Sequence, residues 1–319
     1  MTYFRLKKEL NWSLRDNGII VYEGNKKLQL AINTDKNTDI FLFFKFLSDF
    51  KSEQEIADYP KLTAVEKKDT LNYLKSKNFL QSFDTPTPLT RTDTFLNCFP
   101  NTNFVDFKTY AEACTIVIIG LGTVGSHALD MLVRIGFQHF IIIDGDIVEE
   151  KNLYAQSYFV SDIGNLKVDV MKKRYRVLAD VKIVPHCITP IQLHQITNKL
   201  KKEDIIINAA DDYTLMKKLA QSIMENKLAC KVIESGYGPL LQTAYVVDSF
   251  ETAKLFSDYI EDITKLGNNN INENSGSIMN GYMSAFMIGQ LIISPFVNKK
   301  IKVAEHNFVD DCLKWKEEV

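Results

Sequence analysis

The chain has 319 residues, 45% of them hydrophobic and 24% charged, a balance typical of a globular protein with one large and one small domain. Its formal net charge is −2, so no overall basic field attracts nucleic acid or anionic lipid. The most apolar stretch, residues 283–297, is shorter than the ~20 residues that a membrane span needs, and the first residues lack the apolar core of a signal peptide. We therefore expect a cytoplasmic protein that binds neither nucleic acid nor membranes.

Residues 1–85 predict a compact α+β domain in which three short strands are followed by three helices. We expect the strands at 4–6, 18–22 and 27–31 and the helices at 40–47, 53–59 and 63–77. In the third strand Leu28 and Leu30 alternate with Lys27 and Gln29, the period of a half-buried strand. Thr63 and Glu66 form a capping-box pattern at the start of the last helix.

A stretch rich in Pro and Thr, residues 84–91, predicts an extended connection, because proline fixes φ and lacks a backbone donor. We place a linker at 86–108 and a second domain at 109–319. From residue 114 onward short apolar runs alternate with helical segments, which predicts an α/β fold with a doubly wound, mainly parallel sheet. The asparagine-rich segment 267–276 is expected to be a mobile loop, and whether it closes over a site is left open. The apolar runs are 114–119, 140–143, 181–184, 204–208 and 231–234.

The first of these strands leads into Gly120-Leu-Gly122-Thr-Val-Gly125, which is followed by a helix. In this context the first glycine makes the tight turn, the second lets the backbone approach phosphates, and the third allows helix and strand to pack closely. The N-terminus of the helix favours an anion. Asp144, at the end of the next strand, is placed to accept hydrogen bonds from ribose hydroxyls. The pattern predicts a nucleotide site that suits NAD as well as ATP.

Further polar motifs follow in a fixed order: Asp144-Gly-Asp146, Asn152-Leu-Tyr-Ala-Gln156, Gly164-Asn-Leu-Lys167 and Asp211, just past the end of a strand. In this order, residues 91–300 resemble the ThiF/MoeB superfamily of ubiquitin-activating-like enzymes. The resemblance implies a Rossmann-like adenylation domain, a homodimer, and the use of ATP with Mg²⁺ to convert a carboxylate into an acyl-adenylate.

The resemblance also assigns roles. Attack of a carboxylate on the α-phosphorus brings two anions together, so the site must supply positive charge and placement. Lys167 is expected to neutralise the phosphates, and Asp211 to hold Mg²⁺, which prefers one or two carboxylates plus phosphate oxygens. Taken singly, Lys167 is better explained as a solvated helix lysine and Asp211 as a turn residue, and Asp212 is a neighbour able to share its role. ATP is expected to contact Gly120, Gly122, Gly125, Asp144, Asp146, Asn152, Gln156 and Lys167.

Two departures from the superfamily pattern bear on the chemistry. The arginine of its Asn-x-x-Arg-Gln motif is Ala155 here, which removes a bidentate phosphate contact. Lys151 and Arg91 are the nearest cations in sequence. Arg91 is the better candidate for catalysis, because relatives use an arginine before the domain to reach the partner subunit's site, although a solvated linker arginine fits as well.

The second departure concerns cysteine. The five cysteines, of which none lies between residues 231 and 311, lack Cys-x-x-Cys spacing, so we expect isolated apolar thiols, no zinc, and no thioester or persulfide step. They are Cys98, Cys114, Cys187, Cys230 and Cys312.

Residues 1–85 look like the winged-helix-type leader-recognition elements of enzymes that modify ribosomal peptides. In such elements the third strand (here Lys27, Leu28, Gln29, Leu30 and Ala31) and the last helix (63–77) form a groove to which an extended leader peptide adds as a strand. With no zinc cysteines, the fusion is similar to the adenylating enzymes of microcin C and pantocin A biosynthesis.

We therefore expect an enzyme that adenylates a carboxyl group of a precursor peptide in the biosynthesis of a peptide antibiotic. One alternative is activation of the C-terminus of a sulfur-carrier or ubiquitin-like protein, and another is a non-enzymatic scaffold that presents a peptide. A plain dimerisation or packing role is the alternative for residues 1–85. The sequence does not identify the peptide, the carboxyl group or the group that captures the adenylate.

Overall fold

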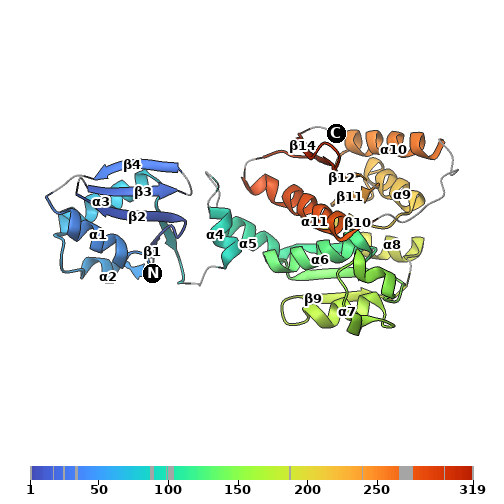
Figure 1. Cartoon of the computed structure of the whole chain (residues 1–319), viewed down its shortest axis with the longest axis horizontal. Helices are drawn as coiled ribbons and strands as arrows, with labels where there is room; N and C mark the ends of the chain where they lie inside the picture. Colours follow the sequence, from blue (N-terminus) through green and yellow to red (C-terminus); the bar gives the residue numbers. More distant parts are fainter. Residues whose placement is uncertain are drawn as a thin grey trace. The chain divides into compact units, whose positions relative to one another are not determined.

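The structure, a computed structural model, divides into two compact units, Met1–Phe104 and Val105–Val319, and we describe each by itself (Figure 1). The residues described are 2–16, 18–23, 26–32, 35–86, 90–97, 99, 104–186, 188–238, 240–265, 276–297 and 299–317. The expected loop 267–276 therefore falls, except for Gly276, outside the described residues, as do Cys98 and Cys187.

The first unit contains two antiparallel three-stranded sheets. One has the order β5 (Lys51–Ser52), β1 (Tyr3–Leu6), β6 (Leu80–Phe83). The other has the order β2 (Leu10–Arg15), β3 (Gly18–Glu23), β4 (Lys26–Ile32), so that β4 lies at an edge of its sheet as the structure describes it. The unit also contains the helices α1 (Asn37–Phe46), α2 (Glu53–Ala57) and α3 (Ala64–Ser76). Its core includes Ile19, Val21, Phe43, Leu47 and Leu74.

All three strands and three helices expected in residues 1–85 are present, and β2, β5 and β6 are additional. The capping box of α3 is confirmed: Thr63 N donates to Glu66 Oε2 (2.8 Å), and Glu66 N donates to Thr63 Oγ1 (3.3 Å). The range 86–108, expected to be a linker, contains α4 (Arg91–Asn97) and the first residues of α5 (Phe104–Ala113). A reciprocal pair of hydrogen bonds between Thr90 and Asp93 satisfies backbone donors at the start of α4, so this part of the range is helical rather than extended.

The second unit is built on an eight-stranded sheet, among the described residues, with the order β14-β13-β12-β11-β10-β7-β8-β9. The five strands from β11 to β9 are parallel, and β12 to β14 are antiparallel. The predicted α/β fold with a mainly parallel sheet is confirmed. The strands are β7 (Thr115–Ile119), β8 (His139–Ile143), β9 (Asp180–Val184), β10 (Ile205–Asn208), β11 (Lys231–Tyr237), β12 (Leu241–Val247), β13 (Val303–Asn307) and β14 (Cys312–Lys316).

Helices cover both faces of this sheet because alternate residues of each strand point to opposite sides. Val117 and Ile119 of β7 share a buried cluster with α8 (Pro190–Thr197), α9 (Tyr213–Met224) and α10 (Phe250–Lys265). Ile118 faces the start of α6 (Thr123–Ile135), which packs along α11 (Ile278–Ile293), as Figure 1 shows. The most apolar stretch of the sequence thus lies mainly in α11, and among the described residues no helix has the length and apolarity to cross a membrane.

Candidate nucleotide site

The glycine motif forms the turn between β7 and α6 at the carboxyl end of the sheet, and Gly122 is the N-cap of the helix. Gly120 has a φ of +88°, and a Cβ added there would lie 2.9 Å from the carbonyl oxygen of Ala209, which follows β10. A Cβ on Gly125 would lie 1.9 Å from the carbonyl oxygen of Gly120. The packing of the protein itself therefore requires the first and third glycines.

Gly122 is different. Its φ is −72°, and the nearest atom to an added Cβ is Gln156 Nε2, at 3.9 Å. No described neighbour forces a glycine at this position, which faces the N-terminal end of α6. A glycine here leaves room for a ligand to approach backbone N–H groups that point outward from the first turn of the helix.

Asp144 lies beside this turn and joins it to the next segment. Its Oδ2 accepts a hydrogen bond from Leu121 N (2.6 Å), and its Oδ1 accepts one from Asp146 N (2.7 Å). The carboxylate is partly exposed. Since each carboxylate oxygen has two lone pairs, both oxygens keep the capacity to accept a bond from a hydroxyl group.

A pocket of about 400 Å³ is lined by four of the residues that are expected to contact ATP. Lys167 begins α7 (Lys167–Tyr175), and its side chain is only 5% exposed. Its ammonium group donates to Asp146 Oδ2 at 2.9 Å, and the Asp146 side chain is 70% exposed. Lys167 is thus a buried cation and not a solvated helix lysine. The pocket is lined by Asp146, Ile147, Glu149, Lys151, Asn152, Gln156 and Lys167.

Residues 149–165, the crossover segment, run from β8 towards α7 through the short helices η1 (Glu150–Tyr154) and η2 (Val160–Asp162). Asn152 is buried, and its Oδ1 accepts a hydrogen bond from Glu149 N at 2.8 Å. Gln156 Oε1 is buried and has no hydrogen-bond partner among the described residues. A buried amide oxygen without a partner is unfavourable, so Gln156 is suited to accept a hydrogen bond from a ligand.

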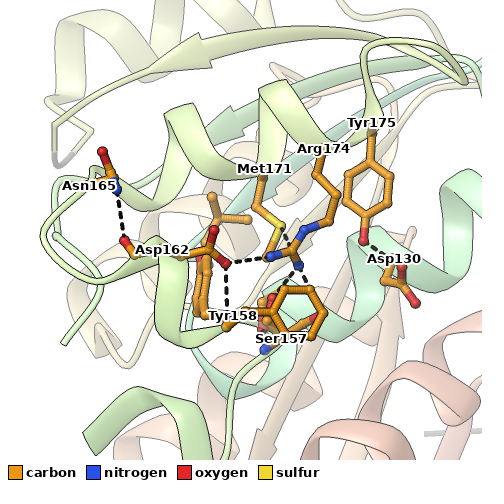
Figure 2. A network of polar contacts seen from close by, with 11 residues as sticks. Asp130, Ser157, Tyr158, Asp162, Asn165, Met171, Arg174 and Tyr175 are labelled. Atoms are coloured by element: carbon orange, nitrogen blue, oxygen red, sulfur yellow. Dashed lines mark hydrogen bonds and ion pairs between the residues drawn. The ribbon is translucent and has the colours of Figure 1, made fainter. Parts of the chain in front are cut away.

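Arg174, on the same helix as Lys167, fastens the crossover segment (Figure 2). Its guanidinium donates to the carbonyl oxygen of Ser157 and to Asp162 Oδ2 (2.7 Å), and it lies over the ring of Phe159. Tyr158 donates a hydrogen bond to the carbonyl oxygen of Leu121 (3.0 Å), which links the segment to the glycine turn. Burial raises the pKa of Tyr158 well above its usual range, so this donor keeps its proton. Sequence analysis did not identify Arg174, because its partners are distant in sequence.

Ala155 occupies the position of the missing family arginine, and the structure shows its surroundings and those of the two candidate cations. The carbonyl oxygen of Ala155 lies 3.1 Å from His127 Nε2, and burial lowers the pKa of this histidine, so the contact is that of a neutral ring that donates. Lys151 lines the pocket but is mostly exposed and pairs with Glu149. Arg91 is exposed on α4 in the first unit.

The two acids after β10 have different environments. Asp212 is the N-cap of α9, and its carboxylate accepts hydrogen bonds from Thr214 N (2.8 Å) and Leu215 N (3.1 Å). Asp211 is exposed, and no described residue forms a hydrogen bond or ion pair with its carboxylate. Among the described residues no three His, Cys, Asp or Glu side chains gather to hold a metal ion. Asp211 is thus one free carboxylate, which fits a cation that takes its other ligands from phosphate and water.

Comparison with known proteins identifies the family. Residues 102–293 match the ThiF family, which covers more than half of the chain. The chain belongs to the ThiF family. Among curated relatives, a probable molybdopterin-synthase adenylyltransferase of Porphyra purpurea is 30% identical over 138 residues, which are 43% of this chain and 35% of the relative. The chain spans between 16% and 35% of the length of the curated relatives that it matches.

Solved structures show that the likeness in fold extends beyond the ThiF region. A crystal structure of E. coli MccB with AMPCPP and MccA superposes with a TM-score of 0.67 at 16% identity, covering 99% of this chain and 96% of MccB. A crystal structure of PaaA superposes with a TM-score of 0.70 at 16% identity, covering 98% of this chain and 99% of PaaA. The likeness in fold to both proteins therefore includes residues 1–104 as well as the ThiF region.

Proposed function

We propose that this ThiF-family protein uses ATP to adenylate a carboxyl group of a ribosomally made precursor peptide. The observation that carries the proposal concerns three neighbouring strands: an open glycine turn follows β7, the Asp146 partner of a buried lysine follows β8, and a free carboxylate follows β10. In a parallel sheet these strand ends form the usual ligand crevice.

The residues take the following roles in the proposed site. Backbone N–H groups at the start of α6 and the ammonium group of Lys167 hold the phosphates, and Asp144 holds a ribose hydroxyl. Gln156 Oε1 accepts a hydrogen bond from a ribose hydroxyl, and the Asn152 amide NH₂ donates to a ribose or phosphate oxygen. Lys167 has three N–H donors, of which Asp146 takes one, so two remain for the ligand.

Asp211 is the proposed Mg²⁺ ligand, and Mg²⁺ supplies charge stabilisation for the departing pyrophosphate. We assign this role to Asp211 because Oδ1 of its neighbour Asp212 accepts two hydrogen bonds at the N-terminus of α9. For the cation missing at Ala155 we propose a homodimer in which Arg91 of one subunit reaches the site of the other. We place the enzyme in the cytoplasm, where ATP and newly made peptides meet.

The first unit supports a peptide as the substrate. The strand β4, which includes Lys27–Ala31, lies at a sheet edge, and an edge strand offers backbone groups to which an extended peptide adds. MccB, one of the proteins with a similar fold, has been crystallised with MccA, and the similarity in fold covers the first unit. We propose that this edge, with α3, receives the leader of the precursor peptide.

The decisive measurement is chromatography of the nucleotides after incubation with ATP, Mg²⁺ and a peptide encoded by a short reading frame beside the gene. Attack at the α-phosphorus yields AMP or AMP-linked peptide and pyrophosphate, whereas attack at the γ-phosphorus yields ADP. Peptide-dependent release of pyrophosphate supports the proposal, and ADP as the main product contradicts it. Asp211→Ala should keep the fold and lower turnover by about 10²–10³-fold, as is usual for loss of one electrostatic contact.

A second candidate is activation of the C-terminus of a sulfur-carrier protein. It is favoured by the similarity to the Porphyra adenylyltransferase. Pyrophosphate release that depends on such a carrier, and not on a peptide, would select it. No turnover with either substrate would select the non-enzymatic scaffold.

A further inference from the structure

A buried pair of polar side chains lies at the end of β10, the strand that precedes the proposed metal ligand Asp211. Asn208 is the last residue of β10, and Glu234 is opposite it on the parallel strand β11. Both are buried, with exposures of 0% and 3%. Neighbouring residues in register point to the same face of a sheet, here the face covered by α9 and α10.

The hydrogen bonds of this pair allow only one orientation of the Asn208 amide. Its Nδ2 donates to Glu234 Oε2 at 2.8 Å, and its Oδ1 accepts from Ala210 N at 3.3 Å. The second bond closes a turn of the kind that asparagine often makes with the residue two positions on. If the amide were reversed, its NH₂ group would face the N–H of Ala210. Glu234 is therefore the acceptor that keeps the oxygen turned to the backbone.

The turn that Asn208 closes is the one that carries Asp211. Ala209 N donates to the carbonyl oxygen of Ile119 at 2.8 Å. The Ala209–Ala210 peptide packs so closely on Gly120 that only a glycine fits there. A shift of this turn would move both Asp211 and the start of the glycine turn.

Glu234 performs this task without carrying a charge. Burial raises its pKa to about 8, and the hydrogen bond from Asn208 only partly offsets the shift. The residue opposite it on β12 is Tyr245, and burial raises the pKa of this tyrosine to about 12, so it stays neutral as well. A neutral carboxyl group accepts a hydrogen bond at much lower cost of burial than a carboxylate.

We propose that Glu234 is a positioning residue for the ThiF chemistry: through Asn208 it holds the Ala209–Ala210 turn, and thereby sets the place of Asp211 beside the glycine turn. The proposal rests on the proposed function for its kinetic consequence, but its structural consequence is measurable without any substrate.

The experiment compares two substitutions in the full chain. Glu234→Gln keeps an acceptor for Asn208 Nδ2, whereas Glu234→Leu has a similar size and none. Glu234→Leu leaves the buried Asn208 Nδ2 without an acceptor, which is destabilising, whereas replacing both partners by apolar residues is often near neutral. The double variant Glu234→Leu/Asn208→Leu therefore serves if the single leucine variant does not fold. Hydrogen exchange measures how well the Ala210 N–H is protected by its bond to Asn208. The Mg²⁺ concentration for half-maximal pyrophosphate release measures how well Asp211 binds the metal.

Glu234→Leu should accelerate exchange at Ala210 by about tenfold or more, since a free-energy change near 1.4 kcal/mol corresponds to that factor. It should also raise the Mg²⁺ requirement by about tenfold while the KM for peptide stays the same, and Glu234→Gln should remain near the wild type in both. Asn208→Leu alone and combined with Glu234→Leu should have equal effects, because the pair acts in series.

Unchanged exchange at Ala210 in Glu234→Leu overturns the proposal, and so does an equal defect in the glutamine variant. If the wild type releases no pyrophosphate, the proposed function fails, and hydrogen exchange still decides the role of Glu234.

Discussion

The glycine turn and the crossover segment lie next to each other at Gln156, but different forces hold them. The turn is fixed by backbone against backbone: Gly120 packs on Ala209, and Gly125 on Gly120. The crossover segment is held by side chains that reach it from elsewhere, chiefly Arg174. Backbone contacts of this kind leave no room for an added atom, whereas side-chain contacts are lost one at a time. We therefore expect abrupt effects of substitution in the turn and graded effects in the segment.

The largest effect is expected for Gly125→Ala. The added methyl group would lie 1.9 Å from the Gly120 carbonyl oxygen, so helix and turn must separate. We expect the free energy of unfolding to fall by several kcal/mol, well above the ~1 kcal/mol typical of a point substitution. Thermal denaturation measures this. The matched control, Gly122→Ala, should keep the melting temperature but weaken ATP binding by about tenfold or more in calorimetry. Equal stability losses in the two variants would contradict the distinction.

The pH dependence of stability tests whether Glu234, which holds the Ala209–Ala210 turn through Asn208, is neutral in the folded protein. Glu234 has a folded-state pKa raised from 4.5 to about 8, so the unfolded state releases its proton at lower pH than the folded state. Its contribution therefore lowers the free energy of unfolding by a few kcal/mol as pH rises through this range, and the loss levels off above pH 8. Denaturant unfolding of the wild type and of Glu234→Gln, which cannot titrate, should show a pH-dependent difference. Parallel curves would mean that Glu234 is ionised in the fold.

Arg174→Met should have an intermediate effect. It removes the donors to Ser157 and leaves the carboxylate of Asp162, which is 17% exposed, without its cation. A lost bond of this type costs about 1–3 kcal/mol, and ATP binding should weaken because Gln156 is adjacent to Ser157. The control is Arg134→Met, which breaks an exposed pair with Asp130 and should change stability by less than about 0.5 kcal/mol. Similar losses in both variants would show that the crossover segment does not depend on Arg174.

Lys151→Met should have the smallest effect on stability, within the error of a denaturant-unfolding measurement, because Lys151 is 77% exposed and its ion pair within the described part of the chain is with Glu149. Its position in the pocket wall makes ATP affinity the more informative measurement. A loss of affinity as large as that of Gly122→Ala would make Lys151, and not Arg91, the replacement for the family arginine.

The parts that sequence analysis predicted are those encoded by local spacing. The glycine turn, Asp144 and Lys167 follow one another at the ends of consecutive elements, and an adjacent strand–turn–helix leaves a pattern in the chain. The strands β12, β13 and β14 were not predicted. Their antiparallel pairing joins segments with mixed polar and apolar residues, such as Cys312–Lys316, whose partners decide the structure.

Glu234 and Arg174 were missed for a related reason. A lone glutamate in the run Lys231–Glu234 is an available signal, since a charged side chain is rarely fully buried without a partner. Its partner Asn208 belongs to another strand, however, and the spacing of residues along the chain does not reveal that contact. For Arg174, a helix rich in lysine and arginine offered several equivalent cations, and only the fold selects one.

Helix α7 carries Lys167 at its first position and Arg174 two turns later. One helix therefore positions both the lysine that lines the pocket and the arginine that holds the crossover segment. Because each residue of an α-helix advances by about 100°, one residue inserted after Val170 would swing Arg174 away from Ser157 while Lys167 stayed in place. The seven-residue spacing therefore keeps the two side chains on the same side of the helix. A homologous chain with a different spacing would need other contacts to hold the crossover segment.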